Sequence, residues 1–277
     1  MLLQVAILVG EVVGGYLTHS LALLSDAGHV FTDVLALVIS LWAVRLAARP
    51  ASGRHTFGFR RAEILAALFN GLSLVVVSVF IFAEAYQRWS NPHPIEVKIM
   101  LVIAVAGLLG NLGGVLWLVK AQRTANIRSA LLHLVSDAVS SVAVVIGGLA
   151  MLWGGPAIID TLVSIFVGLL IVVSALRLVL DVLDVLLETA PTGMATETVI
   201  AALADVQGVL EVHEFHLWRI THELPALSAH ILVDPAADRD QVLQDLQSVL
   251  ASRFAIRHTT LQLEIDRLVR IGTRVRA

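Results

Sequence analysis

The sequence predicts an α-helical membrane protein with six transmembrane helices, followed by a C-terminal α+β domain of ferredoxin-like type. Of the 277 residues, 57% are hydrophobic and 15% are charged, whereas about a quarter of the residues in a soluble globular protein are charged. The mean hydropathy is +0.85. After Pro191 the apolar runs shorten and charged residues become frequent. We therefore divide the chain into a transmembrane domain, 1–188, and a cytoplasmic domain, 189–277.

Each of the six apolar runs is long enough, or nearly so, to cross a hydrocarbon core about 30 Å thick. The N-terminus lacks the basic segment of a signal peptide, so the first run is interpreted as a membrane helix. The tight turn Thr18-His19-Ser20 after it predicts a helical hairpin with the second run. The predicted helices cover residues 2–18, 21–46, 62–88, 96–120, 127–153 and 158–187.

The positions of Lys and Arg predict how the helices are oriented in the membrane. The loop after the second run carries five arginines, and the loop after the fourth carries Lys120, Arg123 and Arg128. The loops after the first and fifth runs carry none, and the loop after the third has only Arg88 and Lys98 at its edges. The positive-inside rule therefore places the ends of the even-numbered helices, and both termini, in the cytoplasm.

The C-terminal part alternates between helix-like and strand-like patterns. The predicted order is helix 195–206, strands 209–220 and 226–234, helix 238–254 and strand 256–265. This order, αββαβ, indicates a small α+β domain of ferredoxin-like type.

Two copies of one motif, His-x-x-x-Asp, lie within the second and fifth apolar runs. They are His29 with Asp33, and His133 with Asp137. Four-residue spacing puts both side chains on one face of a helix, and ionisable side chains inside a membrane are costly and usually functional. Two imidazoles and two carboxylates form a complete ligand set for a divalent cation such as zinc. All four titrate, so metal binding displaces protons, as a metal–proton antiporter requires.

Other interpretations of these residues were weighed. Either pair alone is better explained as a hydrogen-bonded contact that stabilises a bundle, but two pairs at mid-helix depth favour a metal. Asp26, three residues before His29, either hydrogen-bonds to the ligands and orients them or closes the site on its water-filled side, and we favour the first role. Further polar residues in the apolar runs either line a hydrophilic path or form interhelical hydrogen bonds: Glu11, Asn70, Glu84, Asn111 and Asp160.

Composition and ligand number exclude several classes of protein or count against them. The net charge of −3 argues against nucleic-acid binding, and the absence of cysteine excludes thiolate metal sites. Four protein ligands leave no open position for the water or substrate of a metalloenzyme. A tight four-ligand site also holds its ion too long for a channel. A metal sensor with a purely structural membrane site is the other alternative to a transporter.

Five segments of the chain carry a family likeness: 20–43 (SLALLSDAGHVFTDVLALVISLWA), 54–71 (RHTFGFRRAEILAALFNG), 133–148 (HLVSDAVSSVAVVIGG), 216–221 (HLWRIT) and 258–264 (HTTLQLE). Together they resemble the cation diffusion facilitator family of zinc transporters, over nearly the whole chain. The resemblance implies a homodimeric, proton-coupled exporter that works by alternating access. Its expected substrate is Zn²⁺, with Cd²⁺, Co²⁺ or Fe²⁺ as alternatives.

The resemblance also assigns particular residues. It implies that His29, Asp33, His133 and Asp137 are the transport ligands, and that a His in the first of these positions favours zinc. The loop over residues 121–129 contains no His, unlike the His-rich loop of many animal members. We therefore expect a compact bacterial member in the cytoplasmic (inner) membrane.

Histidines in the C-terminal domain form a second candidate metal site. The resemblance implies a regulatory site at the dimer interface that uses His213, His230 and His258. In a regular strand, His213 and His216 point to opposite faces, and His216 is either a further ligand or a packed strand residue. His258 shares its strand face with Glu264, because their spacing is an even number of residues.

Overall fold

The structure is a computed structural model of the chain that describes residues 2–91, 93–120, 125–221 and 223–265. Side chains within these ranges are described except at 117–120, 125–134 and 136. By its internal contacts the chain divides into two units, one formed by 1–43 with 66–179 and the other by 44–65 with 180–277. Each unit is described by itself.

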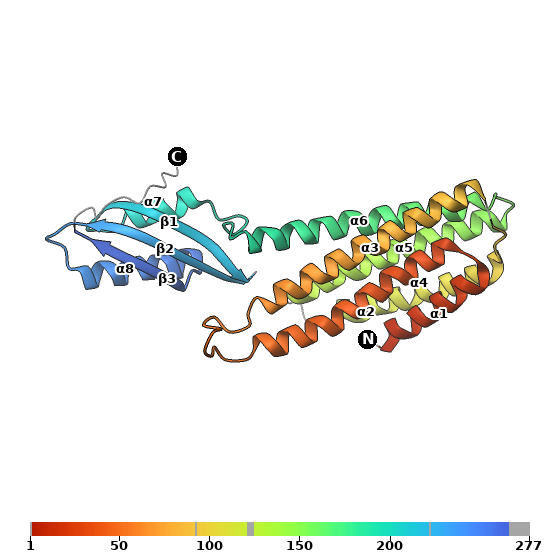
Figure 1. Cartoon of the computed structure of the whole chain (residues 1–277), viewed down its shortest axis with the longest axis horizontal. Helices are drawn as coiled ribbons and strands as arrows, with labels where there is room; N and C mark the ends of the chain where they lie inside the picture. The colour runs from red at the N-terminus through yellow and green to blue at the C-terminus, as the bar shows by residue number, and fades with distance from the viewer. Residues whose placement is uncertain (1, 92, 121–124, 222, 266–277) are drawn as a thin grey trace. The chain divides into compact units, whose positions relative to one another are not determined.

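Six long helices follow one another along the chain, as predicted, and end within a few residues of the predicted bounds (Figure 1). Large apolar side chains such as Phe80 and Val102 are exposed on their outer surfaces. Exposed apolar surface on this scale is typical of helices that face lipid. The helices are α1 (Leu2–Thr18), α2 (Leu21–Ala47), α3 (Ala62–Ser90), α4 (Val97–Lys120), α5 (Ala125–Leu152) and α6 (Ile158–Leu186).

Four of these helices are long and apolar enough to span a membrane by length and composition. They are α2, α3, α6 and the part of α4 from Val97 to Leu116. Among the residues searched, α1 and the Asp137–Leu152 part of α5 are apolar but shorter than a full span. The chain therefore has a helical transmembrane domain that contains at least four complete spans.

Glycines allow α1 to pack closely on α4. A Cβ at Gly110 of α4 would lie 2.7 Å from the side chain of Ile7, and a Cβ at Gly14 of α1 would overlap Ile103. Small residues at helix crossings let the backbones approach in a membrane. This packing buries the face of α1 that carries Glu11, which is 1% exposed.

A buried carboxylate from α6 caps the beginning of α2. Asp160 accepts hydrogen bonds from the Ser20 hydroxyl at 2.6 Å and from the Leu21 backbone N–H at 2.7 Å. The first N–H groups of a helix have no partner within the helix, and the helix dipole favours a negative charge there. This contact between residues 139 positions apart holds the end of α2 that leads to the first His-x-x-x-Asp motif.

The C-terminal part has the predicted order αββαβ. Its elements are α7 (Thr196–Ala204), β1 (Val209–Thr221), β2 (Leu224–Val233), α8 (Arg239–Phe254) and β3 (His258–Glu264). The strand order is β1-β2-β3, with β1 antiparallel to β2 and β2 parallel to β3. The parallel pair requires a crossover connection, which α8 supplies.

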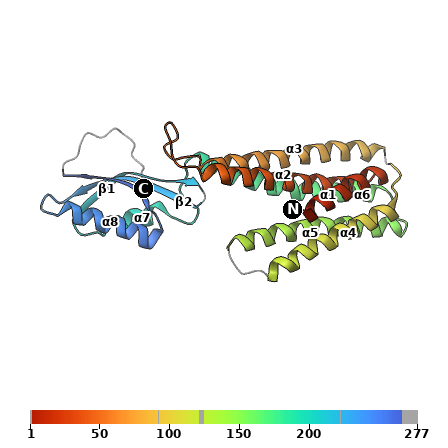
Figure 2. The same cartoon turned by 90° about the horizontal axis from the view of Figure 1, so that it is seen from below.

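Both helices of this domain cover the same face of the sheet (Figure 2). The core between them is formed by Leu203 of α7, Leu246 and Leu250 of α8, and Leu227 and Ile231 of β2. Because side chains alternate along a strand, residues at the even positions of β2, such as His230, lie on the other, helix-free face.

Replacing Asp160 with Asn is expected to destabilise the membrane domain. Asn keeps the size, but it loses the charge and turns one acceptor oxygen into a donor that faces backbone N–H groups. We expect the free energy of unfolding to fall by about 1–2 kcal/mol, as for other lost helix caps, measured by thermal unfolding in detergent. Asp184→Asn, at an exposed position of the same helix, is the control, and an equal effect of both changes would contradict the capping role.

Candidate metal-binding sites

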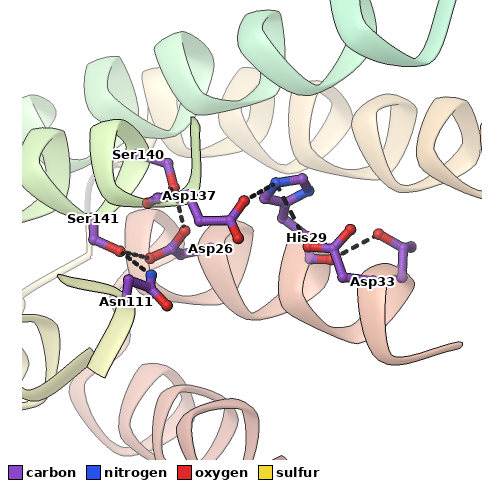
Figure 3. A network of polar contacts seen from close by, with 8 residues as sticks. Asp26, His29, Asp33, Asn111, Asp137, Ser140 and Ser141 are labelled. Carbon is purple, nitrogen blue, oxygen red and sulfur yellow. Dashed lines mark hydrogen bonds and ion pairs between the residues drawn. The ribbon is translucent and has the colours of Figure 1, made fainter. Parts of the chain in front are cut away.

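Two helices bring three ligand-type side chains together inside the membrane domain (Figure 3). His29 and Asp33 come from α2 and Asp137 from α5. The His29 Nε2 atom lies 3.2 Å from Oδ1 of Asp137 and 3.8 Å from Oδ2 of Asp33. One ligand atom from each residue lies within 4.8 Å of the others. Tetrahedral zinc with bonds of about 2.0–2.1 Å needs ligand atoms roughly 3.4 Å apart, so the group is close to the required size.

The fourth predicted ligand is His133. It lies in α5, one helical turn before Asp137, but its side chain is outside the part of the chain that the structure describes. The structure therefore brings three of the four predicted residues together and leaves the position of the fourth imidazole a prediction.

The two carboxylates of this group are buried, which makes their charges costly unless they are compensated. Asp33 and Asp137 are both buried, at 6% and 4% exposure. An isolated carboxylate in such a place loses its hydration without compensation. The His29 ring contacts both carboxylates. A divalent cation would compensate both charges at once, and the arrangement is therefore suited to exchange a metal ion for protons.

Asp26 belongs to a polar network beside these ligands (Figure 3). The Ser140 hydroxyl donates to Oδ1 of Asp26 at 2.7 Å and the Ser141 hydroxyl donates to Oδ2 at 3.1 Å. Asn111 of α4 donates from Nδ2 to the Ser141 hydroxyl at 3.2 Å. Among the described residues, Asp26 takes its hydrogen bonds from α5 rather than from the His29 ring. It therefore holds α2 against α5 next to the ligands.

Sequence reasoning did not single out the two serines. Ser140 and Ser141 follow Asp137 by three and four residues, which places them on the same side of α5. The oxygen of Ser140 also lies 2.9 Å from the backbone carbonyl oxygen of Asp137. This spacing of three and four residues from a predicted ligand is the sequence signal that could have identified the two serines.

A second group of ligand-type side chains lies on the helix-free face of the C-terminal sheet. Nε2 of His213 lies 3.1 Å from Oε2 of Glu264, and Nδ1 of His230 lies 2.9 Å from Oε1 of the same carboxylate. The two imidazole rings are 5.6 Å apart, centroid to centroid. The Gln262 amide also donates to Glu264, at 2.7 Å. His213, His230 and Glu264 each offer an atom within 4.8 Å of the others, which is suitable for holding a metal ion.

A β-bulge determines where the β1 histidines point. His213 pairs with His230 and His216 pairs with Ser228, so three steps on β1 oppose two on β2. Within the bulge, Glu214 has a φ of 45°, a left-handed conformation that is uncommon for a residue other than glycine. Because His230 and Ser228 share a face, His213 and His216 also share it. The prediction that they point to opposite faces is wrong because it assumed a regular strand.

His258 lies away from this group. It begins β3 and is level with Ala226 of β2, four positions from His230 and therefore about 13 Å along the strand. Glu264, at the other end of β3, is the third ligand-type side chain of this group, and the role of His258 as a ligand stays a prediction. Both residues lie on the same strand face, as their spacing predicted, but only Glu264 is at the right level of the sheet.

Long apolar helices with a buried His/Asp group, joined to a small α+β domain, define an integral-membrane transporter of metal cations. Residues 1–187 match the family model described as the cation efflux transmembrane domain, and residues 191–266 match that of the cation efflux protein cytoplasmic domain. The chain belongs to the cation efflux family, that is, to the cation diffusion facilitators. It is a transporter rather than an enzyme, and the α+β domain is its cytoplasmic domain.

Curated relatives match over most of their own length. The zinc transporter ZitB of Shigella flexneri is 41% identical over 258 residues, which cover 92% of this chain and 82% of that one. The cation efflux system protein CzcD of Cupriavidus metallidurans is 39% identical, covering 93% and 82%. The cadmium, cobalt and zinc/H⁺–K⁺ antiporter of Bacillus subtilis is 36% identical, covering 92% and 84%.

Among solved structures, the metal-bound C-terminal domain of the CzcD transporter is similar to part of the chain. It is 30% identical, with a TM-score of 0.25, and covers 26% of this chain and 100% of that one.

Changes at Glu264 and His258 are expected to affect metal binding differently. In a full-length protein whose membrane site is removed by Asp33→Ala and Asp137→Ala, Glu264→Gln should weaken Zn²⁺ binding by about ten-fold or more, because one charged ligand is lost. His258→Ala should leave the affinity unchanged. Isothermal titration calorimetry measures both, and a larger effect at His258 would contradict the assignment of Glu264.

Proposed function

We propose that the protein exports Zn²⁺ from the cytoplasm in exchange for protons, by alternating access. The observation that carries this proposal is the buried meeting of His29, Asp33 and Asp137, contributed by two helices. These three residues, with His133 as the fourth ligand, would enclose the ion completely. A complete set of titratable ligands suits transport, because protons held at the site are released as the metal arrives and taken up again as it leaves.

The transport cycle follows from the same residues. Cytoplasmic Zn²⁺ enters through an inward-facing opening, binds the four ligands and displaces the protons that the site holds. The helices rearrange so that the site opens to the other side, where protons compete for the ligands and the ion leaves. The protonated site then returns to the inward-facing state, driven by the proton gradient.

The choice of metal rests on the ligands and on the relatives. Imidazole and carboxylate ligands suit Zn²⁺ and also accept other first-row divalent ions. Relatives that cover most of the chain are named for zinc, cadmium and cobalt. Cd²⁺ and Co²⁺ are therefore retained as further substrates. Fe²⁺ is not, because none of the relatives described above is named for iron.

The proposed topology has six membrane spans. It counts α1 and α5 as full spans in addition to the four that satisfy the length criterion, because both are apolar and both coincide with membrane helices predicted from the sequence. The arginine-rich loops after α2 and α4 lie in the cytoplasm, as do both termini. The membrane is a bacterial cytoplasmic (inner) membrane, and the transport domain comprises residues 1–188.

Residues 189–277 form a cytoplasmic domain of ferredoxin-like type that joins two copies of the chain in a homodimer. His213, His230 and Glu264 form a regulatory metal site on its helix-free sheet face. Metal bound there would replace the contacts that the two imidazoles now make with one carboxylate. At high Zn²⁺ concentration this binding would tighten the dimer and raise the transport rate.

Loss of either membrane carboxylate is expected to abolish transport. Asp33→Ala or Asp137→Ala removes one of the charges that compensate the metal, so Zn²⁺ flux into proteoliposomes should fall at least about ten-fold. The assay uses an imposed pH gradient and a zinc-sensitive dye inside the vesicles. Asp184→Asn is the control and should transport normally. Full flux in either Ala variant would refute the site, and Zn²⁺ binding without any flux in the wild type would favour a sensor.

Replacing His29 with Asp is expected to change the order in which metals compete. The substitution exchanges a nitrogen ligand for a hard oxygen ligand, which lowers the preference for zinc over ions that favour oxygen. Competition between Zn²⁺, Cd²⁺ and Co²⁺ in the same flux assay measures the change. An unaltered order would show that His29 does not determine the metal preference.

A further inference from the structure

Glu11 is a deeply buried carboxylate that the proposed metal site does not use. It lies in the middle of α1, and neither of its oxygens has a hydrogen-bond partner among the residues that the structure describes. A Cβ at Gly107 of α4 would lie 2.7 Å from its Oε1 atom, so the carboxylate occupies space that only a glycine leaves open. Burial makes a charged carboxylate costly there, because none of the described residues donates a hydrogen bond to it.

The charged groups near Glu11 are those of the metal site. Asp26 and His29 of α2 and Asp137 of α5 are close enough to interact electrostatically with it, and Asp33 is one turn from His29. On α4, which packs against α1, the described charged residue Lys98 lies exposed near the beginning of the helix. The surroundings of Glu11 therefore contain several carboxylates. Among the described residues close to it, the His29 imidazole is the one group that can carry a positive charge.

A charge count shows what a metal would change. Zn²⁺ on Asp33 and Asp137 cancels both of their charges, whereas an imidazolium at His29 cancels only one. Metal binding therefore makes the local charge more positive by about one unit, and at short range in a low dielectric this strongly favours an ionised neighbour. Asp26 has hydroxyl donors from Ser140 and Ser141 in either state. Glu11 has no such donor within the part of the chain that the structure describes, so its charge is more sensitive to the metal.

We propose that Glu11 is a proton-binding group of the transport cycle, separate from the metal ligands. It holds a proton while the site is free of metal, releases it to water when the ion binds, and takes up a proton again when the ion leaves. This inference rests on the proposed metal–proton exchange and adds one proton to those displaced from the ligands themselves. The coupling is reciprocal, so protonation of Glu11 weakens metal binding.

Counting the protons released on metal binding tests this role. The full-length protein in detergent is titrated with Zn²⁺, by calorimetry in buffers of different ionisation enthalpy, at several pH values. Compared with the wild type, Glu11→Gln should release up to about one proton fewer per Zn²⁺. Its Zn²⁺ affinity should therefore depend less on pH, with the change per pH unit smaller by a factor of up to about ten. Glu84→Gln on α3, whose carboxylate pairs with Arg88 at 2.9 Å, is the matched control and should behave as the wild type.

Further variants separate this role from a purely structural one. Glu11→Met also lacks a titratable group but fills the space with apolar atoms, and should show the same loss if the Gln variant does not fold. Glu11→Asp should restore the proton release. Zn²⁺ binding with unchanged proton release in Glu11→Gln would overturn the inference. So would complete loss of binding in folded Glu11→Gln, because Glu11 would then be a ligand. A wild type that binds Zn²⁺ without releasing protons would instead refute the proposed exchange.

Discussion

Charge compensation inside the membrane domain is the constraint on which the rest of the structure depends. Asp33 and Asp137 are both withdrawn from water, and burying two carboxylates next to each other is costly unless positive charge compensates them. The His29 imidazole lies within reach of both carboxylates and can share either protons or a metal ion with them. The site is therefore suited to alternate between a state that holds protons and a state that holds a metal ion, as a metal–proton antiporter requires.

The surrounding packing keeps these groups at a fixed separation. Asp26 joins α2 to α5 through two serine hydroxyls, and Asn111 extends the network to α4. Asp160 fixes the beginning of α2, at Ser20 and Leu21. Ligand geometry is thus set by hydrogen bonds between helices, as expected where lipid provides no hydrophobic force to press the helices together.

Much of this arrangement was predictable from the sequence because it depends on local patterns. Six apolar runs predicted the six long helices, and the αββαβ order and the four-residue spacing of His29 and Asp33 were read correctly. The errors came from features that are not local. A single extra residue in β1 reversed the expected direction of His216. The pairing level of β3 decided that Glu264, and not His258, meets His213. The register between β1 and β2 and the register between β2 and β3 both depend on how two strands pair, so the periodicity of a single strand does not predict them.

The cap on α2 has a consequence for how the protein is made. Its donors lie at Ser20 and Leu21, but its acceptor lies in the sixth helix, 139 residues later. During synthesis α2 enters the bilayer long before Asp160 leaves the ribosome. Its first N–H groups must then be satisfied by water or lipid headgroups, which keeps that end near the membrane surface. Insertion of the sixth helix is therefore the step that completes the cap of α2.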